Sequence, residues 1–149
     1  MPADPCYLQR AIDISRKCVK SNTAYCVGAV IVTKKGQQFE GYTHETGLHN
    51  HAEEEALKKA FDSGADLSGA SIYSSMEPCS TRKSKPVSCT ELIIRNGFER
   101  VVYAYAEPDC FVRCEGTRML RDAGVEVDII AGLAPQVEEI NSHILKAVK

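Results

Sequence analysis

The chain has 149 residues, of which 44 % are hydrophobic, and its formal net charge at pH 7 is −2. This size and composition predict one globular domain over residues 1–149 and argue against a disordered chain. No apolar run approaches the roughly 20 residues that span a bilayer, and the acidic balance gives no general attraction to nucleic acid. We therefore expect a protein that works without a membrane or a nucleic-acid partner.

The cysteines and the N-terminus bear on the compartment. The first residues lack the basic start and apolar core of a signal peptide, so we expect a cytoplasmic protein, where disulfides are rare. The chain has seven cysteines, and two of them, Cys79 and Cys89, fall in a metal-like pattern. We expect the other five to be reduced thiols: Cys6, Cys18, Cys26, Cys110 and Cys114.

The first elements are a helix and a hairpin. Asp4 followed by Pro5 is a good helix start, and apolar residues at helical spacing predict an amphipathic helix over residues 5–20. Residues 25–33 are nearly all apolar and rich in β-branched types, which indicates a central strand covered on both faces. After a turn at Gly36, residues 37–43 return as the second strand.

A polar loop from His44 to Asn50 leads into a second helix that opens with His51-Ala52-Glu53. We expect Asn50 to cap this helix, with Glu53 three residues later as the capping-box partner. Residues two apart on a helix point roughly 200° away from each other. His51 and Glu53 can therefore share a site only at the N-terminal tip. Gly64 is expected to end the helix, whose packing face comprises Ala52, Ala56, Leu57, Ala60 and Phe61.

The third predicted strand, residues 70–76, runs directly into Glu77-Pro78-Cys79. Nine residues then separate Cys79 from Cys89, whereas zinc deaminases commonly have Cys-x-x-Cys spacing. Ser88 and Glu91 form a capping box, which places Cys89 at the first position of a helix that runs to about residue 96. Both thiolates can then approach one metal, from a strand end and a helix start.

The remaining elements are a strand over residues 101–106, a helix over 117–123, a strand over 125–130 and a last helix that begins at Pro135. This order predicts an α/β protein, a three-layer α-β-α sandwich with a mixed five-stranded sheet whose later strands run parallel. Ligand sites in such sheets lie beyond the strand ends, near helix starts. The candidate metal ligands fall at those places.

The residue types explain the expected chemistry. Zinc takes imidazole nitrogen and thiolate sulfur, and a catalytic zinc keeps one tetrahedral position open for water. His51, Cys79 and Cys89 would supply three ligands for Zn²⁺, and Glu53 would be the proton carrier and not a ligand.

Each part of the pattern also has an ordinary explanation, since acidic residues favour a first helical turn and lone cysteines are often buried thiols. A structural zinc would need a fourth protein ligand, which Cys110 or Cys114 could supply. The combination of residues, in this order, favours the catalytic site.

With these residues assembled, the chain resembles the cytidine-deaminase-fold superfamily, and within it the riboflavin-biosynthesis pyrimidine deaminases of the fungal type. The long spacing between the two cysteines is the most discriminating feature of the likeness. The resemblance covers nearly the whole chain and rests on five stretches: residues 24–30, His44 seven residues before His51, His51-Ala52-Glu53, Met76-Glu77-Pro78-Cys79-Ser80 with the insert to Cys89, and residues 107–112.

The resemblance implies a small phosphorylated substrate, a diaminopyrimidinone with a ribitylamino or ribosylamino 5′-phosphate, whose 2-amino group leaves as ammonia. The fungal type implies the ribityl form, although the sequence does not distinguish the two. Bacterial relatives usually carry Asn-Pro before Val-Gly, where this chain has Tyr25-Cys26 after Ala24, so their sugar contacts there are not carried over. Members of the family are commonly dimers or tetramers, so a homodimer or higher homo-oligomer is expected.

Several residues are candidate substrate contacts. A sugar phosphate needs positive charge and hydrogen-bond donors, although basic residues in a loop are often merely solvated. The insert offers Ser80, Thr81, Arg82 and Lys83, and His44, His49 and Asp109 are weaker candidates for contacts to the base or sugar. The alternatives are a deaminase of another free base or nucleotide, of the cytosine or guanine type, and a non-catalytic domain with a structural zinc. The lack of an aromatic and basic stripe argues against a deaminase that edits nucleic acids.

Overall fold

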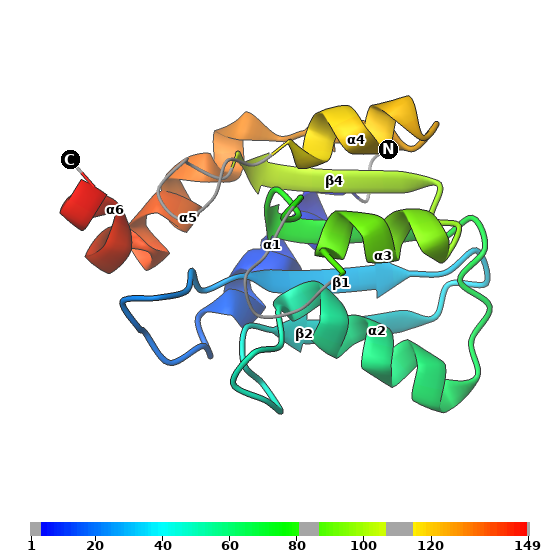
Figure 1. Ribbon diagram of the computed structural model, residues 1–149, viewed down its shortest axis with the longest axis horizontal. Coiled ribbons are helices and arrows are strands. Elements are labelled where there is room, and N and C mark those ends of the chain that lie inside the picture. The colour runs from blue at the N-terminus through cyan, green and yellow to red at the C-terminus, as the bar shows by residue number, and fades with distance from the viewer. Residues whose placement is uncertain (1–3, 81–86, 107–114, 149) are drawn as a thin grey trace.

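A computed structural model of the chain describes residues 4–80, 87–106 and 115–148. Its centre is a five-stranded sheet with the strand order β2-β1-β3-β4-β5 (Figure 1). β1 pairs antiparallel with β2 and with β3, whereas β3, β4 and β5 run parallel. The predicted mixed five-stranded sheet is therefore confirmed. The strands are β1 Gly28–Val32, β2 Gln38–Tyr42, β3 Ser71–Met76, β4 Arg100–Tyr105 and β5 Glu126–Ile129.

Helices cover both faces of the sheet, which confirms the three-layer sandwich. On one face α2, α3 and α4 pack over Ile31, Ile72 and Val101, and on the other α1, α5 and α6 pack over Val30 and Val102. The helices are α1 Asp4–Ser15, α2 Ala52–Ser63, α3 Cys89–Arg95, α4 Gly116–Asp122, α5 Ala134–Ile140 and α6 Ser142–Val148, with a short 3₁₀ turn, η1, at Ala131–Leu133. No helix in the described ranges has the length and apolar character needed to cross a bilayer.

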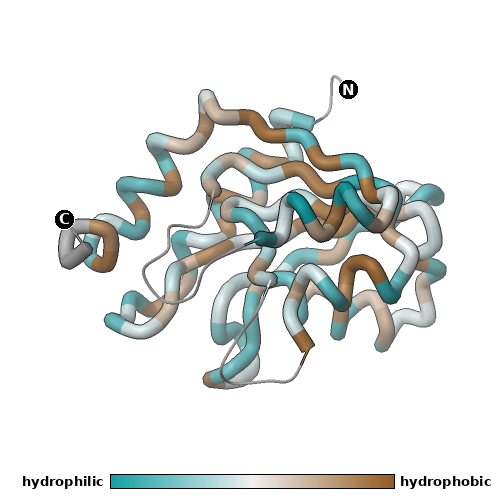
Figure 2. The backbone as a smooth tube through the Cα atoms, turned by 45° about the horizontal axis from the view of Figure 1, so that its top comes forward, coloured by the Kyte–Doolittle hydropathy of each residue, from teal (hydrophilic) through white to brown (hydrophobic). Residues whose placement is uncertain are grey.

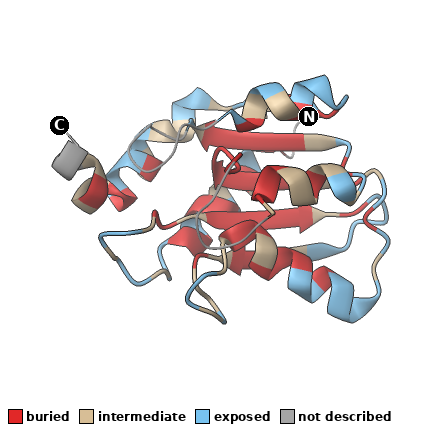
Figure 3. Ribbon diagram, viewed as in Figure 1, coloured by how far each residue is buried: buried red, intermediate tan, exposed pale blue. Residues whose placement is uncertain are grey.

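Burial follows this layering. The three central strands are buried along most of their length (Figure 3), as expected for strands covered on both faces. Hydrophobic and hydrophilic segments alternate along the helices (Figure 2), because each helix turns one face to the sheet. The packing face predicted for α2 is buried except for Phe61, which is 56 % exposed. The prediction was therefore wrong for Phe61 and right for the other four residues. Phe61 lies one turn beyond Leu57 on the same flank of α2, and this flank is buried only in the first turns.

Gly41 on β2 sets how closely α2 approaches the sheet. A Cβ atom on this glycine would lie 2.5 Å from the carbonyl oxygen of Ala52 and 2.7 Å from the Cβ of Glu55. Both distances are far below van der Waals contact, so a larger residue would push α2 outward. A glycine at this position therefore lets the first turns of α2 lie directly on β2.

α1 is anchored by charge as well as by packing. The carboxylate of Asp4 is buried, accepts a hydrogen bond from the hydroxyl of Tyr73 at 2.7 Å and pairs with the guanidinium of Arg100. Arg100 also pairs with Asp128, at 2.6 Å, so one guanidinium joins α1, β4 and β5. The hydrogen bond from Arg100 holds the pKa of Asp4 well below its ordinary value. This ion cluster fixes the start of α1 to β3, β4 and β5.

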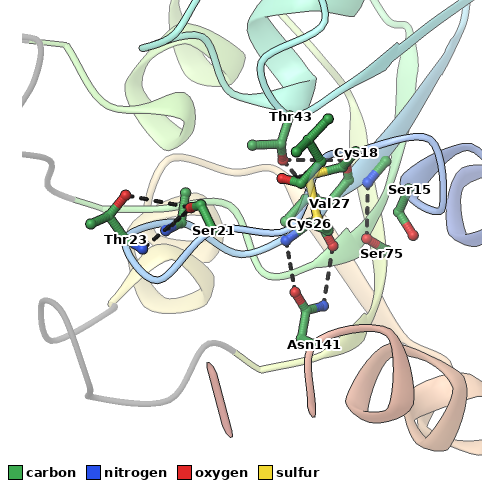
Figure 4. The surroundings of a disulfide bond; sticks show 12 residues. Ser15, Cys18, Ser21, Thr23, Cys26, Val27, Thr43, Ser75 and Asn141 are labelled. Carbon is green, nitrogen blue, oxygen red and sulfur yellow. Dashed lines mark hydrogen bonds between the residues drawn. A yellow bond between two sulfur atoms is a disulfide. The ribbon is translucent and has the colours of Figure 1, made fainter. Parts of the chain in front are cut away.

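A disulfide bond corrects the prediction that Cys18 and Cys26 are reduced (Figure 4). α1 ends at Ser15, before the predicted residue 20, and the next residues form tight turns in which the amide of Cys18 bonds to the carbonyl of Ser15. The hydroxyl of Ser21 then accepts hydrogen bonds from two later amides and reverses the chain. These turns bring the two Cα atoms within 5.5 Å, a distance typical of disulfides. Cys6 is a free thiol, and Cys110 and Cys114 lie outside the described residues.

The last predicted helix is divided into α5 and α6 at Asn141. The buried amide side chain of Asn141 accepts from the backbone N–H of Cys26 at 2.7 Å and donates to the carbonyl of Cys26 at 3.1 Å (Figure 4). It also donates to the carbonyl of Val137, four residues earlier. Asparagine side chains that bond to nearby backbone groups compete with helical hydrogen bonding, which accounts for the interruption.

Candidate metal centre

Three side chains predicted as metal ligands meet where two helices begin on the same face of the sheet. His51 is the N-cap residue of α2, Cys79 follows the end of β3, and Cys89 is the first residue of α3. The Nδ1 atom of His51 lies 3.3 Å from the sulfur of Cys89 and 3.6 Å from the sulfur of Cys79. All three ligand atoms lie within 4.8 Å of one another.

This geometry fits a tetrahedral zinc ion. With Zn–S bonds near 2.3 Å and Zn–N bonds near 2.0–2.1 Å, ligand atoms at the corners of a tetrahedron are about 3.5–3.8 Å apart. The two nitrogen–sulfur distances of 3.3 Å and 3.6 Å are close to this range. Within the part of the chain that the structure describes, the cluster contains these three residues, the number that a catalytic zinc takes from a protein.

The local electrostatics favour the thiolate that a metal requires. The pKa of Cys79 is held well below its ordinary value by a hydrogen bond from Cys89, and His51 acts in the same direction. The backbone N–H of Cys89, at the start of α3, also donates to the sulfur of Cys79 at 3.3 Å. Backbone donors at a helix start stabilise negative charge. A metal ion would therefore find one ligand already disposed to ionise.

The segment that carries Cys79 is fixed by contacts from two helices. On α3, the amide of Thr90 donates to the carbonyl of Cys79 at 3.1 Å and its hydroxyl donates to the carbonyl of Pro78 at 3.2 Å. The carboxylate of Glu77 accepts from the amide and the hydroxyl of Thr117 on α4, at 2.9 Å and 2.6 Å. Contacts from α3 and α4 therefore hold the segment that carries the sulfur.

Glu53 lies in the first turn of α2, 3 % exposed. Burial raises its pKa to about 7, and its carboxylate is near enough to His51 and Cys79 for both to act on that pKa. The predicted capping arrangement was wrong. His51 caps the helix, and Glu54 is the residue whose carboxylate accepts from the backbone N–H of His51, at 2.8 Å.

Two consequences follow for the site. The capping role goes to Glu54, so the ordinary explanation for Glu53 no longer holds. The backbone of His51 is extended, with φ −83° and ψ 163°, so the helical rotation between residues two apart does not separate its ring from Glu53. The location of both residues at the helix tip agrees with the sequence-based expectation.

The predicted substrate contacts have mixed outcomes. His44 is half-buried, with its pKa lowered by burial and by the neighbouring His51, whereas His49 is exposed. Ser80 is buried, and its hydroxyl accepts from the backbone N–H of Glu115 at 2.8 Å. Thr81, Arg82, Lys83 and Asp109 lie outside the described residues.

Sequence analysis missed two buried carboxylates near the centre. One is Glu77, bonded to Thr117. The other is Glu55 on α2, 1 % exposed and bonded to Thr46. A signal for Glu55 was present in the sequence, because an acidic residue directly before Ala56 lies close to the apolar face of the helix.

The family model that describes the cytidine and deoxycytidylate deaminase zinc-binding region matches residues 1–105. Among curated proteins, a diaminohydroxyphosphoribosylamino-pyrimidine deaminase of Schizosaccharomyces pombe is 45 % identical over 81 % of this chain and 30 % of its own length. The riboflavin biosynthesis protein RibD of Aquifex aeolicus is 36 % identical over 85 % of this chain and 34 % of its own length. The chain thus spans about a third of the length of these relatives.

Solved structures share the fold over nearly the whole chain. A diaminohydroxyphosphoribosylaminopyrimidine deaminase and 5-amino-6-(5-phosphoribosylamino)uracil reductase of Thermotoga maritima has a TM-score of 0.85 and 31 % identity, covering 96 % of this chain and 40 % of that one. The Rib2 deaminase of Aspergillus oryzae has a TM-score of 0.80 and 26 % identity, covering 95 % of this chain and 91 % of that one. The same Aspergillus protein has also been solved in complex with DARIPP.

Proposed function

We propose that this chain, which belongs to the cytidine and deoxycytidylate deaminase family, is a zinc-dependent hydrolytic deaminase of the riboflavin pathway. Its substrate is 2,5-diamino-6-ribitylamino-4(3H)-pyrimidinone 5′-phosphate, and its products are the corresponding pyrimidinedione and ammonia. The observation that carries the proposal is the cluster of His51, Cys79 and Cys89, with the buried carboxylate of Glu53 beside it.

Each residue of the centre has a distinct role. The Nδ1 atom of His51 and the sulfurs of Cys79 and Cys89 would hold the ion. Zinc, when bound, lowers the pKa of its water towards neutrality and so supplies a nucleophile at physiological pH. Glu53 accepts a proton from the attacking water, protonates a ring nitrogen of the pyrimidine, and delivers a proton to the leaving amine. The C2–N bond breaks, a carbonyl forms at C2, and ammonia leaves.

The environment of Glu53 suits this role. A general acid and base works best when its pKa lies near the working pH, so that both protonation states are accessible. Burial moves the pKa of Glu53 from its ordinary value of 4.5 to about 7. A bound cation would lower it again, which favours the ionised form that begins the reaction.

The choice of substrate rests on the relatives. The Schizosaccharomyces and Thermotoga proteins carry the name of the pyrimidine deaminase, and the Aspergillus structure shows a related deaminase with DARIPP. Within the proposal, Ser80, Thr81, Arg82 and Lys83 contact the phosphate, because a sugar phosphate needs charge and donors. His44, His49 and Asp109 contact the base or the ribityl chain.

The test measures ammonia release from the ribitylamino and ribosylamino pyrimidine 5′-phosphates side by side, with cytidine, cytosine and guanine as further substrates. The proposal expects turnover of the ribityl compound with a higher kcat/KM than any other substrate. Turnover of a cytosine or guanine compound alone would reassign the substrate. Absence of all turnover by zinc-loaded protein would favour a non-catalytic zinc domain.

The proposal also covers location and assembly. A phosphorylated pyrimidine does not cross membranes unaided, which supports a cytoplasmic enzyme that meets its substrate where it is made. The family that the chain resembles commonly forms dimers or tetramers, so the proposal includes a homodimer or higher homo-oligomer. Light scattering on the purified protein measures the assembly directly.

A further inference from the structure

The loop between β2 and α2, residues 43–50, is tied to α2 by a buried carboxylate (Figure 1). Glu55 is 1 % exposed, and both of its oxygens accept hydrogen bonds from a single loop residue. The backbone N–H of Thr46 donates to one oxygen at 2.6 Å, and its hydroxyl donates to the other at 2.7 Å. Charge-assisted bonds of this kind are about twice as strong as neutral ones.

Burying the carboxylate of Glu55 costs free energy of folding unless its oxygens are paired. Glutamate is almost never fully buried unless it is paired, and within the described residues Glu55 has no ion-pair partner. Glu55 lies on the buried side of α2, next to the fully buried Ala56. Gly41 on β2 leaves the space in which the stem of Glu55 lies.

The loop held in this way has a strained backbone beside the metal centre. His44 has φ +62°, a left-handed conformation that costs a non-glycine residue about 1 kcal/mol or more. Its amide donates to the carbonyl of Asn50 at 2.9 Å, and Asn50 directly precedes His51. Such strain persists only where the surroundings over-determine it, and the bonds from Thr46 to Glu55 provide that constraint.

We propose that Glu55 is a positioning residue, whose hydrogen bonds to Thr46 hold the loop over residues 43–50 at the rim of the metal centre, in the conformation that receives the substrate. The inference rests on the proposed function, which supplies the identity of the substrate. Glu55 acts through the loop and touches no reacting atom. Its loss therefore affects substrate binding and the shielding of His51. Glu53 and the three ligands stay in place, because they are held by α2, the end of β3 and the start of α3.

The test compares four variants of the zinc-loaded protein. Glu55→Gln keeps the shape of the side chain but replaces one accepting oxygen with an NH₂ group, which cannot accept a hydrogen bond from Thr46. Thr46→Val removes the hydroxyl that donates to Glu55, at an exposed residue. Thr46→Ser keeps both bonds and serves as the conservative control, and Glu138→Gln is the matched charge control on the exposed side of α5. Thr46→Val keeps the test valid if Glu55→Gln fails to fold.

Two readouts are measured, the steady-state constants for ammonia release and the rate at which a chelator removes zinc. Glu55→Gln and Thr46→Val should each raise KM roughly ten-fold, the effect of losing one charge-assisted hydrogen bond, and speed zinc removal by a similar factor. Because Glu55 touches no reacting atom, kcat should stay within about two-fold of wild type, and the zinc content should be unchanged. Both controls should match wild type.

A purely structural role gives a different result. In that case Glu55→Gln would lower the melting temperature but leave KM and the rate of zinc removal as in wild type, which overturns the proposal. If wild-type protein releases ammonia from neither pyrimidine, the proposed function fails on its own. The rate of zinc removal still decides the role of Glu55 in that case, because it needs no substrate.

Discussion

Replacing Glu53 with glutamine should have opposite effects on activity and on stability. The substitution keeps the size and shape of a side chain that is 3 % exposed, but it removes the charge and the ability to carry a proton. In the zinc-loaded protein the general acid and base is lost. In the zinc-free protein a buried carboxylate with an unfavourable charge is lost.

The stability effect can be worked out from the pKa. Burial raises the pKa of Glu53 from 4.5 to about 7 in the folded protein, so the folded state binds more protons than the unfolded state between these values. Stability therefore falls as the pH rises from about 4.5 to about 7, and stays reduced above that. At about 1.4 kcal/mol for each pKa unit, the loss is about 3–4 kcal/mol. Glu53→Gln should remove it.

The assay is urea unfolding of zinc-free wild type and Glu53→Gln at pH 4.5 and pH 8.5, with Glu138→Gln as the exposed control. The variant should be more stable than wild type by about 3–4 kcal/mol at pH 8.5 and nearly equal to it at pH 4.5. Zinc-loaded Glu53→Gln should keep its metal but lose at least about 10³-fold in kcat, as expected when a proton carrier is removed. Equal stability at both pH values would refute the reasoning on burial, and wild-type kcat would refute the mechanism.

The disulfide joins two cysteines that are eight residues apart in the sequence. Its reduction, or the double substitution Cys18→Ser/Cys26→Ser, should therefore lower the free energy of unfolding by about 2–3 kcal/mol through the loss of loop closure. Urea unfolding with and without dithiothreitol measures this, and an unchanged midpoint in wild type would contradict it. Arg100 lowers the pKa of Asp4 below its ordinary value of 3.8. The stability that Asp4 contributes is therefore complete above pH 3.8 and is lost as the pH falls towards the lower pKa of the folded state. Arg100→Gln should flatten this acid-dependent loss in thermal melts between pH 2 and pH 5, and an identical pH profile would show that the pair does not act this way. Removing the metal with a chelator at neutral pH should abolish ammonia release and lower the melting temperature, with both restored by Zn²⁺. A chelated protein of full activity would exclude a metal-dependent mechanism.

Local patterns predicted the elements well because each is determined by nearby residues. The start of α3 at Cys89 followed from the side chain of Ser88, whose oxygen accepts from the amide of Glu91 at 3.2 Å. The strands followed from runs of apolar residues, and the parallel pairing of the later strands followed from the helices between them. The clustering of the ligand residues followed from the same elements, since they fall at helix starts and a strand end.

The features that sequence analysis missed depend on the detailed geometry of turns and helix caps, or on contacts between distant segments. The pairing of Cys18 with Cys26 depends on how α1 ends and on a turn stabilised by one serine hydroxyl. The break at Asn141 depends on Cys26, 115 residues away. The choice of Glu54 over Glu53 as the capping partner required the observed position of the N-cap, one residue later than predicted. A shift of one residue reassigns side chains around a helix by about 100°.

The long spacing between the cysteines is compatible with a close approach of the two ligands. Cys79 is positioned by the end of β3 and by Thr90, and Cys89 by the capped start of α3. A direct hydrogen bond from the amide of Cys89 to the sulfur of Cys79, at 3.3 Å, then joins the two ligand positions. Of the described insert residues, Ser88 enters these contacts as the cap of α3, so the end of the insert next to Cys89 is part of the ligand geometry. The two helix starts and the strand end therefore bring the three ligand atoms together across a long gap in the sequence.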